Sequence, residues 1–257
     1  MNQEDLIKKI MSKKEFSKLP KEDVQRVLES FDKKDLLDEE KVKLSRDLLR
    51  KMYTAFVSSK LLNVKDKESE WFLKKHISTR ERFGSYEELY ERLLKNFNKK
   101  FVVFDLGAGV NGFSYEYFKD REVSYVAIEA VGQLVELMNN YFKKNNNDAV
   151  AIHESLFNLE SVKKILESKT GKKIVFLFKT IDSLEMLDRN YSKELLMEIV
   201  PLVDEVVVSF ATHSLISKKK FNVRRNWIIR FIEENFIILD DFKLGNERYI
   251  VIKTKDL

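Results

Sequence analysis

Five apolar runs that alternate with longer amphipathic or polar segments constrain the fold of this chain more than any other feature. They are FVVFDL, SYVAIEA, AVAIHES, KIVFLFKT and EVVVSFAT, spread over residues 101–212. Strands separated by helix-length segments are typical of a parallel sheet with helical crossovers. Two further runs, FIILDDF and RYIVIKT, are separated only by KLGNE, which is short enough for an antiparallel hairpin. The pattern predicts an α/β fold with a seven-stranded doubly wound sheet that ends in an edge hairpin.

The residues before about 100 contain no comparable run and carry helical periodicity instead. Apolar residues recur at three- and four-residue spacing in QEDLIKKIM, KEDVQRVLESF, DEEKVKLSRDLLRKMYTAFV and YEELYERLLKNF. Pro20 is suited to the start of a helix. We therefore predict a helical domain over residues 1–75, followed over residues 76–257 by the domain that contains the sheet.

The first apolar run leads into a glycine turn, FVVFDLGAGVNGF, which matches two different cofactor patterns. G-x-G-x-x-G at Gly107, Gly109 and Gly112 is the dinucleotide fingerprint, but Asp105 would repel a pyrophosphate and bulky aromatic residues follow Gly112. D-x-G-x-G is the pattern of S-adenosylmethionine-dependent methyltransferases, whose ligand carries an ammonium and a sulfonium that a carboxylate attracts. The turn favours S-adenosylmethionine and the Rossmann-like sheet of class I methyltransferases.

Acidic residues also end the next two apolar runs. Glu129 ends the second run, where a carboxylate would accept hydrogen bonds from both ribose hydroxyls, although NAD enzymes place an acid similarly. Glu154, followed by Ser155, ends the third run near the expected adenine edge. The alternative for each acid is a solvated loop position. Two acids at successive strand ends favour the methyl donor.

Composition removes several chemistries. The chain has no cysteine and three scattered histidines, which excludes disulfides and a cysteine nucleophile and argues against a metal site. Its two prolines cannot form the [N/D]-P-P-[Y/F] motif of exocyclic-amine methyltransferases. No run approaches the roughly 20 apolar residues of a membrane helix, and the N-terminus lacks the apolar core of a signal peptide. We expect a soluble cytoplasmic protein without membrane association.

Together, several motifs make this chain resemble a known family. HISTRERF with its S-T-x-E-R element, FDLGAGVNGF, FLFKTIDSLE, VVVSFATHSL and GNERYIVI are similar to segments of the aminoglycoside-resistance methyltransferases of the Arm/Rmt type. The likeness covers nearly the whole chain. It implies a 16S rRNA (guanine(1405)-N(7))-methyltransferase that uses S-adenosylmethionine and acts on the 30S decoding centre.

The resemblance also implies roles for single residues. Arg82 would contact the methionine carboxylate with Thr79 nearby, and Lys179 would lie on the methyl side as a positioning group. Guanine N7 has a free lone pair, so its methylation requires alignment and no general base. The expected donor-binding residues are Thr79, Arg82, Asp105, Gly107, Gly109, Glu129, Glu154 and Ser155.

A basic segment after the fifth run is the candidate RNA contact. It contains Lys218, Lys219, Lys220, Arg224 and Arg225, and its alternative is a solvated helix face. Together with the lysine-rich helical domain, this segment would form one face that docks on RNA. The helical domain would make no contact with the donor. The loop is shorter than in the family, which leaves open a methyltransferase of another RNA position, of a protein or of a small molecule. A silent RNA-binding protein is disfavoured by the intact donor motif, and we expect a monomer.

Overall fold

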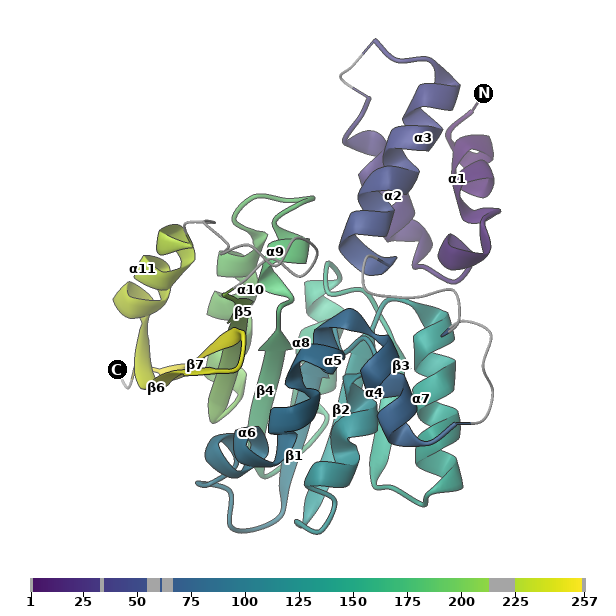
Figure 1. Cartoon of the computed structure of the whole chain (residues 1–257). Helices are drawn as coiled ribbons and strands as arrows, with labels where there is room; N and C mark the ends of the chain where they lie inside the picture. The colour runs from purple at the N-terminus through teal and green to yellow at the C-terminus, as the bar shows by residue number, and fades with distance from the viewer. Residues whose placement is uncertain (1, 33–34, 55–60, 62–66, 213–224, 256–257) are drawn as a thin grey trace.

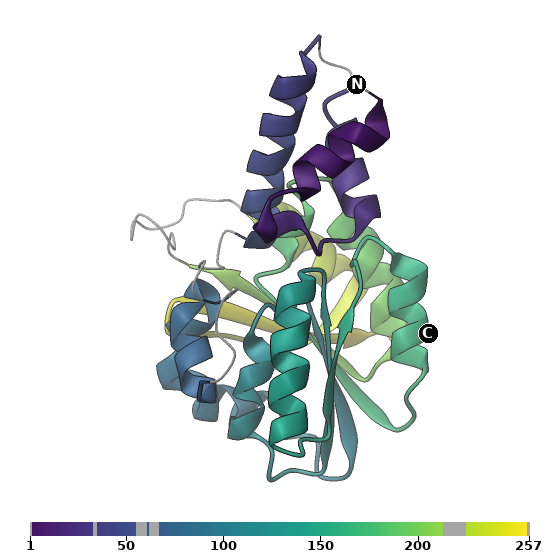
Figure 2. The ribbon, with the colours of Figure 1, turned by 90° about the vertical axis from the view of Figure 1, so that its right-hand side faces the viewer.

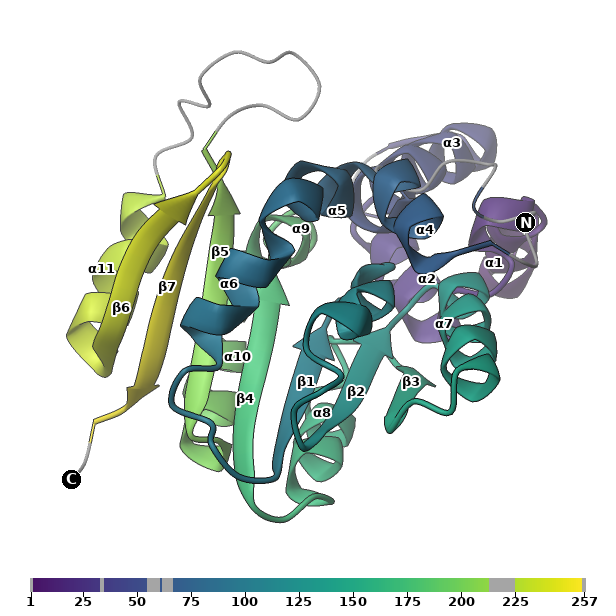
Figure 3. The same cartoon turned by 60° about the horizontal axis from the view of Figure 1, so that its bottom comes forward.

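Seven strands form one sheet in the order β3-β2-β1-β4-β5-β7-β6, which Figure 3 shows from edge to edge. The computed structural model describes residues 2–32, 35–54, 61, 67–212 and 225–255. The strands are β1 Phe101–Leu106, β2 Val123–Glu129, β3 Ala149–His153, β4 Lys172–Phe178, β5 Glu205–Ala211, β6 Phe236–Leu244 and β7 Glu247–Thr254.

The directions of the strands confirm the predicted fold. β1 pairs in parallel with β2 and β4, and the outer pairs β2–β3 and β4–β5 are also parallel. β7 is antiparallel to both β5 and β6, so the hairpin closes one edge as expected. The five parallel strands end at one edge, where this class of sheet binds its ligands.

Helices cover both faces of the sheet (Figure 2). One face carries α4 Ser69–Lys75, α5 Ile77–Arg82, α6 Tyr86–Leu93, the 3₁₀ helix η5 Asn111–Tyr117 and α7 Gly132–Lys144. The other carries α8 Leu159–Glu167, α10 Tyr191–Ile199 and α11 Asn226–Asn235, while the short α9 Ile181–Leu184 follows β4. Because both faces are covered, the central strands β1 and β5 are buried along their whole length.

A group of N-terminal helices lies at the carboxyl ends of the strands (Figure 1). It comprises α1 Gln3–Met11, η1 Lys14–Phe16, α2 Lys21–Glu29, α3 Asp38–Leu49 and the π-helical turn η2 Arg50–Thr54. Asn2 caps α1 by accepting a hydrogen bond from the backbone N–H of Asp5 at 2.8 Å, and α2 begins directly after Pro20 as predicted. We call residues 2–54, as far as they are described, the helical region.

The helix α4 packs against the part of the protein that contains the sheet, although it precedes residue 76. Its Phe72 stacks on Phe113 of η5 with ring centroids 4.1 Å apart. A domain boundary between residues 75 and 76 stays a prediction. No helix in the described parts of the chain combines the length and apolar character needed to cross a membrane.

Candidate functional site

A cavity lies at the carboxyl ends of β1, β2 and β4 and is bordered by α5 and by η2. The strand ends meet there because the sheet is parallel. Of the residues singled out by the sequence, its lining includes Thr79, Arg82, Asp105, Gly107, Gly109, Glu129 and Lys179. Residues as far apart in the sequence as Thr79 and Lys179 are thus brought to one site.

The glycine turn at the end of β1 has two glycines that no other residue could replace without strain. Gly107 and Gly109 have φ values of 72° and 58°. A Cβ on Gly107 would come within 2.9 Å of the Thr180 side chain. Gly112 serves packing instead, because a Cβ there would lie 2.7 Å from the sulfur of Met138 on α7. The third glycine of the apparent dinucleotide fingerprint is therefore explained by a helix contact.

The two carboxylate oxygens of Asp105 differ in their hydrogen bonding. Its Oδ2 accepts hydrogen bonds from the Tyr125 hydroxyl and the Asn111 amide, both at 2.7 Å. Its Oδ1 is buried and has no hydrogen-bond partner among the described residues. Burial raises the pKa of Asp105 even though both hydrogen bonds oppose this. A cationic ligand would relieve this unfavourable burial.

Glu129 at the end of β2 holds the glycine turn in place. Its two oxygens accept backbone hydrogen bonds from Val131 at 2.8 Å and from Gly109 at 2.7 Å. Burial raises its pKa. Each carboxylate oxygen has more than one lone pair, so both remain able to accept from ribose hydroxyls.

Arg82 is buried and oriented by three side chains. Its guanidinium donates to Glu247 at 3.0 Å and to Asn111 and Ser78 at 2.8 Å each. The guanidinium also lies 4.8 Å from the ring centroid of Phe178. Among the described residues these bonds use three of its five N–H groups, which leaves two for a ligand carboxylate.

Glu247, at the start of β7, had no role assigned from the sequence, yet it contacts two residues of the cavity lining. It lies 3.0 Å from both the Arg82 Nε and the Lys179 ammonium, and it also accepts from the Ser209 hydroxyl. Burial would raise its pKa, but the positive charges of Arg82 and Lys179 prevail and lower it. Glu247 therefore neutralises two buried cations in the wall of the cavity.

Lys179 follows β4 in a left-handed backbone conformation, with φ at 59°. Its ammonium also donates to Glu81 at 2.7 Å, and its backbone N–H donates to Ser209. Non-glycine residues seldom adopt this conformation without a local reason. Here it accompanies a side chain held between two carboxylates at the cavity.

The polar groups of the remaining predicted donor-binding residues form hydrogen bonds within the protein. Thr79 lines the cavity but its hydroxyl donates to the backbone oxygen of Leu73 at 2.7 Å. Glu154 lies outside the lining and accepts a hydrogen bond from the Ser161 hydroxyl of α8. Ser155 is buried and donates to Asp23 of the helical region at 2.6 Å. An adenine contact by Glu154 or Ser155 stays a prediction.

Most of the candidate RNA-binding residues, Lys218, Lys219, Lys220 and Arg224, lie outside the described residues. Arg225 is described and largely buried. It forms a two-pronged ion pair with Asp182 of α9, at 2.6 and 3.0 Å, and donates to the backbone oxygen of Ala211 at 2.8 Å. These contacts fasten the start of α11 to α9, and an RNA contact by Arg225 stays a prediction.

The helical region contributes to the lining of the cavity. The expectation that this region makes no donor contact stays a prediction. Met52 and Tyr53 of η2 are part of the lining. Amphipathic periodicity shows that a segment is helical but not what its ends approach, so nothing in the sequence indicated this contact. We therefore expect deletion of residues 1–75 to impair donor binding as well as docking.

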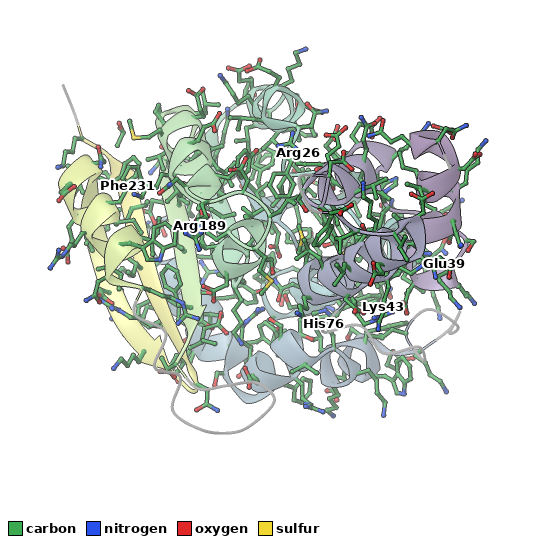
Figure 4. The ribbon with its side chains drawn as sticks, turned by 90° about the horizontal axis from the view of Figure 1, so that it is seen from above. Arg26, Glu39, Lys43, His76, Arg189 and Phe231 are labelled. Atoms are coloured by element: carbon green, nitrogen blue, oxygen red, sulfur yellow. The ribbon has the colours of Figure 1, made fainter. Side chains whose placement is uncertain are left out.

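His76, at the junction of α4 and α5, lines the same cavity; Figure 4 labels it in a view from the helical end. Burial, together with the charges of Arg82 and Lys179, lowers its pKa from 6.5 to about 3. Between these pH values only the unfolded chain binds the proton, so His76 should reduce stability as the pH falls below 6.5.

As the pH falls below 6.5, we expect the unfolding free energy of the wild type to decline relative to that of His76→Asn. The slope of this difference should approach about 1.4 kcal/mol per pH unit at pH 5. Urea unfolding of both proteins between pH 8 and pH 5 measures this difference. Parallel curves would show that His76 binds its proton equally in the folded and unfolded states.

Across the described residues no group of three or more metal-ligating side chains is present. The buried carboxylates of the cavity, Asp105 and Glu129, accept hydrogen bonds from neighbouring protein groups.

Comparison with known proteins places this geometry in context. Residues 36–252 match the ribosomal RNA methyltransferase (FmrO) family. A 16S rRNA (guanine(1405)-N(7))-methyltransferase from Proteus mirabilis is 22% identical over 185 residues, which cover 69% of this chain and 62% of that protein, less than two thirds of its length.

Solved structures show the same fold over nearly the whole chain. The 16S rRNA methylase RmtB superposes with a TM-score of 0.77 at 20% identity, covering 99% of both chains. The 16S rRNA methyltransferase RmtF, solved in complex with S-adenosyl-L-homocysteine, gives a TM-score of 0.78 at 19% identity and covers 99% of this chain and 100% of its own. The family match spans most of the sheet and its cavity, and the chain belongs to the ribosomal RNA methyltransferase (FmrO) family.

Proposed function

We propose that this protein is an S-adenosylmethionine-dependent 16S rRNA (guanine(1405)-N(7))-methyltransferase that acts on the 30S decoding centre. The observation that carries the donor assignment is the unpartnered Oδ1 of Asp105 in a cavity that also contains Arg82. An acceptor and a buried cation in one cavity complement the ammonium and carboxylate of an amino acid. The family match and the relative from Proteus mirabilis support the reaction and the target.

The residues of the cavity fit this donor from one end to the other. Asp105 would accept from the ammonium, Arg82 would donate its two remaining N–H groups to the carboxylate, and Glu129 would accept from the ribose. The donor supplies an electrophilic methyl group on its sulfonium. Because β1, β2 and β3 are neighbours in the sheet, the adenosine end would extend toward the loop after β3.

The cavity supplies orientation in place of proton transfer. Guanine N7 carries a lone pair and no proton, so the reaction needs the two atoms held in line and near 3 Å apart. Lys179 donates to Glu81 and Glu247, an arrangement that fixes its ammonium as a positive group at the methyl side. Its proposed role is to position the target base.

Docking on the subunit requires cations spread over a wide surface. The helical region offers exposed lysines such as Lys8 and Lys13, and the basic segment that includes Lys218, Lys219, Lys220 and Arg224 would complete this face. Figure 4 shows the helical end of the molecule, with Arg26 on α2 and Lys43 on α3. We propose that the protein acts as a cytoplasmic monomer and that its methylation protects the ribosome from aminoglycosides.

Methyl transfer to purified 30S subunits tests this function. With labelled S-adenosylmethionine we expect incorporation into 16S rRNA, and after borohydride and aniline treatment primer extension should stop at guanine 1405. Naked 16S rRNA serves as the control and should be a much poorer substrate. A stop at another nucleotide, or equal activity on naked RNA, would contradict the target while leaving the donor site intact.

A further inference from the structure

A buried hydrogen-bond bridge connects the helical region to the cavity. Asp23 of α2 is 1% exposed. Its Oδ2 accepts from the Tyr53 hydroxyl and its Oδ1 accepts from the Ser155 hydroxyl, both at 2.6 Å. The carboxylate thus joins α2, η2 and the loop after β3, and we call these three side chains the Asp23 bridge.

Both arms of the Asp23 bridge reach the wall of the cavity. Tyr53 is itself a lining residue, and Ser155 is followed by the lining residues Leu156 and Phe157. The Ser155 hydroxyl also accepts from the backbone N–H of Phe157 at 3.0 Å, which fixes the turn of this loop. Arg26, one helical turn beyond Asp23, lies 5.2 Å from the ring centroid of Phe157. One carboxylate therefore fixes two segments of the wall that are far apart in the sequence.

A second contact braces the loop after β2. The backbone oxygen of Lys18 accepts from the N–H of Gly132 at 3.0 Å, and the Gln133 side chain donates to the backbone oxygen of Lys14 at 2.8 Å. The approach is so close that a Cβ on Gly132 would lie 2.9 Å from the Lys18 side chain. This loop carries Val131, whose N–H orients Glu129. The helical region thus supports the loops after β2 and β3.

We propose that Asp23 and Tyr53 are positioning residues for the adenosine end of the donor, and that they couple donor binding to docking of the helical region on RNA. The proposal rests on the proposed function, since that function supplies both ligands. The methionine end is assigned to Asp105 and Arg82 at β1, so the loops after β2 and β3 are left for the nucleoside. A donor that orders these loops also orders the helical region attached to them.

Calorimetry with S-adenosylmethionine tests the first part. Tyr53→Phe removes only the hydroxyl of one arm, and Ser155→Ala removes the other arm. We expect each to weaken donor binding about 5- to 20-fold. Asp23→Asn removes the charge that both arms share and should weaken binding at least as much. Asp32→Asn is its matched control, because Asp32 lies just after α2 and among the described residues forms an ion pair only with Lys41; it should keep wild-type affinity.

A donor fragment separates the two ends of the site. 5′-Methylthioadenosine lacks the amino acid, so Tyr53→Phe should weaken its binding by the same factor as that of S-adenosylmethionine. Asp105→Asn should weaken S-adenosylmethionine and leave the fragment unchanged. A general loosening of the fold would reduce the affinity for both ligands in both variants, and that result would overturn the positioning role.

Coupling is measured by binding of 30S subunits with and without S-adenosylhomocysteine. Binding linkage is reciprocal, so each ligand must raise the affinity of the other by the same factor. We expect the factor to fall toward one in Tyr53→Phe. Wild-type affinities and an unchanged factor in Tyr53→Phe and Ser155→Ala would overturn the inference, whereas a wild-type protein that binds no S-adenosylmethionine would overturn the proposed function itself.

Discussion

Asp105→Asn should weaken S-adenosylmethionine binding by about 1.5 to 3 kcal/mol, the range of hydrogen bonds to charged groups. The substitution replaces a carboxylate with an amide of the same shape. The amide oxygen can still accept from Tyr125 and Asn111, while the amide N–H₂ group would face the ligand ammonium. Because burial already raises the pKa of Asp105, loss of its charge should leave the unfolding free energy unchanged or higher.

Isothermal titration calorimetry and urea unfolding of the same preparation measure the two opposite effects. Asp120→Asn, an identical change at an exposed position, is the control and should alter neither. Parallel losses of affinity and stability would indicate that Asp105 supports the fold and not the ligand. Wild-type affinity would remove Asp105 from the donor site.

Glu247→Gln should lower the unfolding free energy by about 3 to 5 kcal/mol, the usual result of removing one member of a buried ion cluster. Among the residues that the structure describes, the change leaves the buried cations Arg82 and Lys179 with only Glu81 as a carboxylate partner. Glutamine can still accept a hydrogen bond but cannot neutralise charge. Donor binding should weaken too, because the Nε of Arg82 then pairs with a neutral amide in place of a carboxylate.

The pH dependence of this variant has a defined sign. The folded-state pKa of Glu247 lies below its ordinary value of 4.5, so its stabilising contribution is complete above that pH and is lost as the pH falls through the folded pKa. The difference between wild type and Glu247→Gln in urea unfolding should therefore be constant near neutrality and shrink below pH 4.5. The control is Asp241→Asn on the same hairpin, which breaks a more exposed pair with Arg248 and should cost under about 1 kcal/mol. An equal loss in both variants would refute the buried cluster.

The predicted site residues that the structure places at the cavity include several whose positions are set by local sequence. Asp105, Gly107 and Gly109 lie within five positions and lead out of one strand, so a single motif specifies the turn. Parallel strand order then places Glu129 beside them, because the ends of neighbouring parallel strands share one edge.

The contacts that the sequence could not predict join residues over long separations. Glu247 lies 165 positions from Arg82, and only the pairing of β7 with β5 brings them together. Asp23 and Ser155 are 132 positions apart, on elements whose periodicity predicts a helix and a strand but not their contact. Arg225 looks like part of a basic run until its pairing with Asp182, 43 positions earlier, is known.

Glu247 also bears on the order in which the site can form during synthesis. Translation proceeds from the N-terminus, so Arg82 and Lys179 leave the ribosome long before the carboxylate that neutralises them. The nascent chain can form the first strands and the glycine turn. Burial of Arg82 and Lys179 is unfavourable until the edge hairpin supplies the carboxylate of Glu247. Pairing of β7 with β5 then brings Glu247 to Arg82 and Lys179, which line the cavity. We expect a chain that can hold its donor only after its edge hairpin has formed.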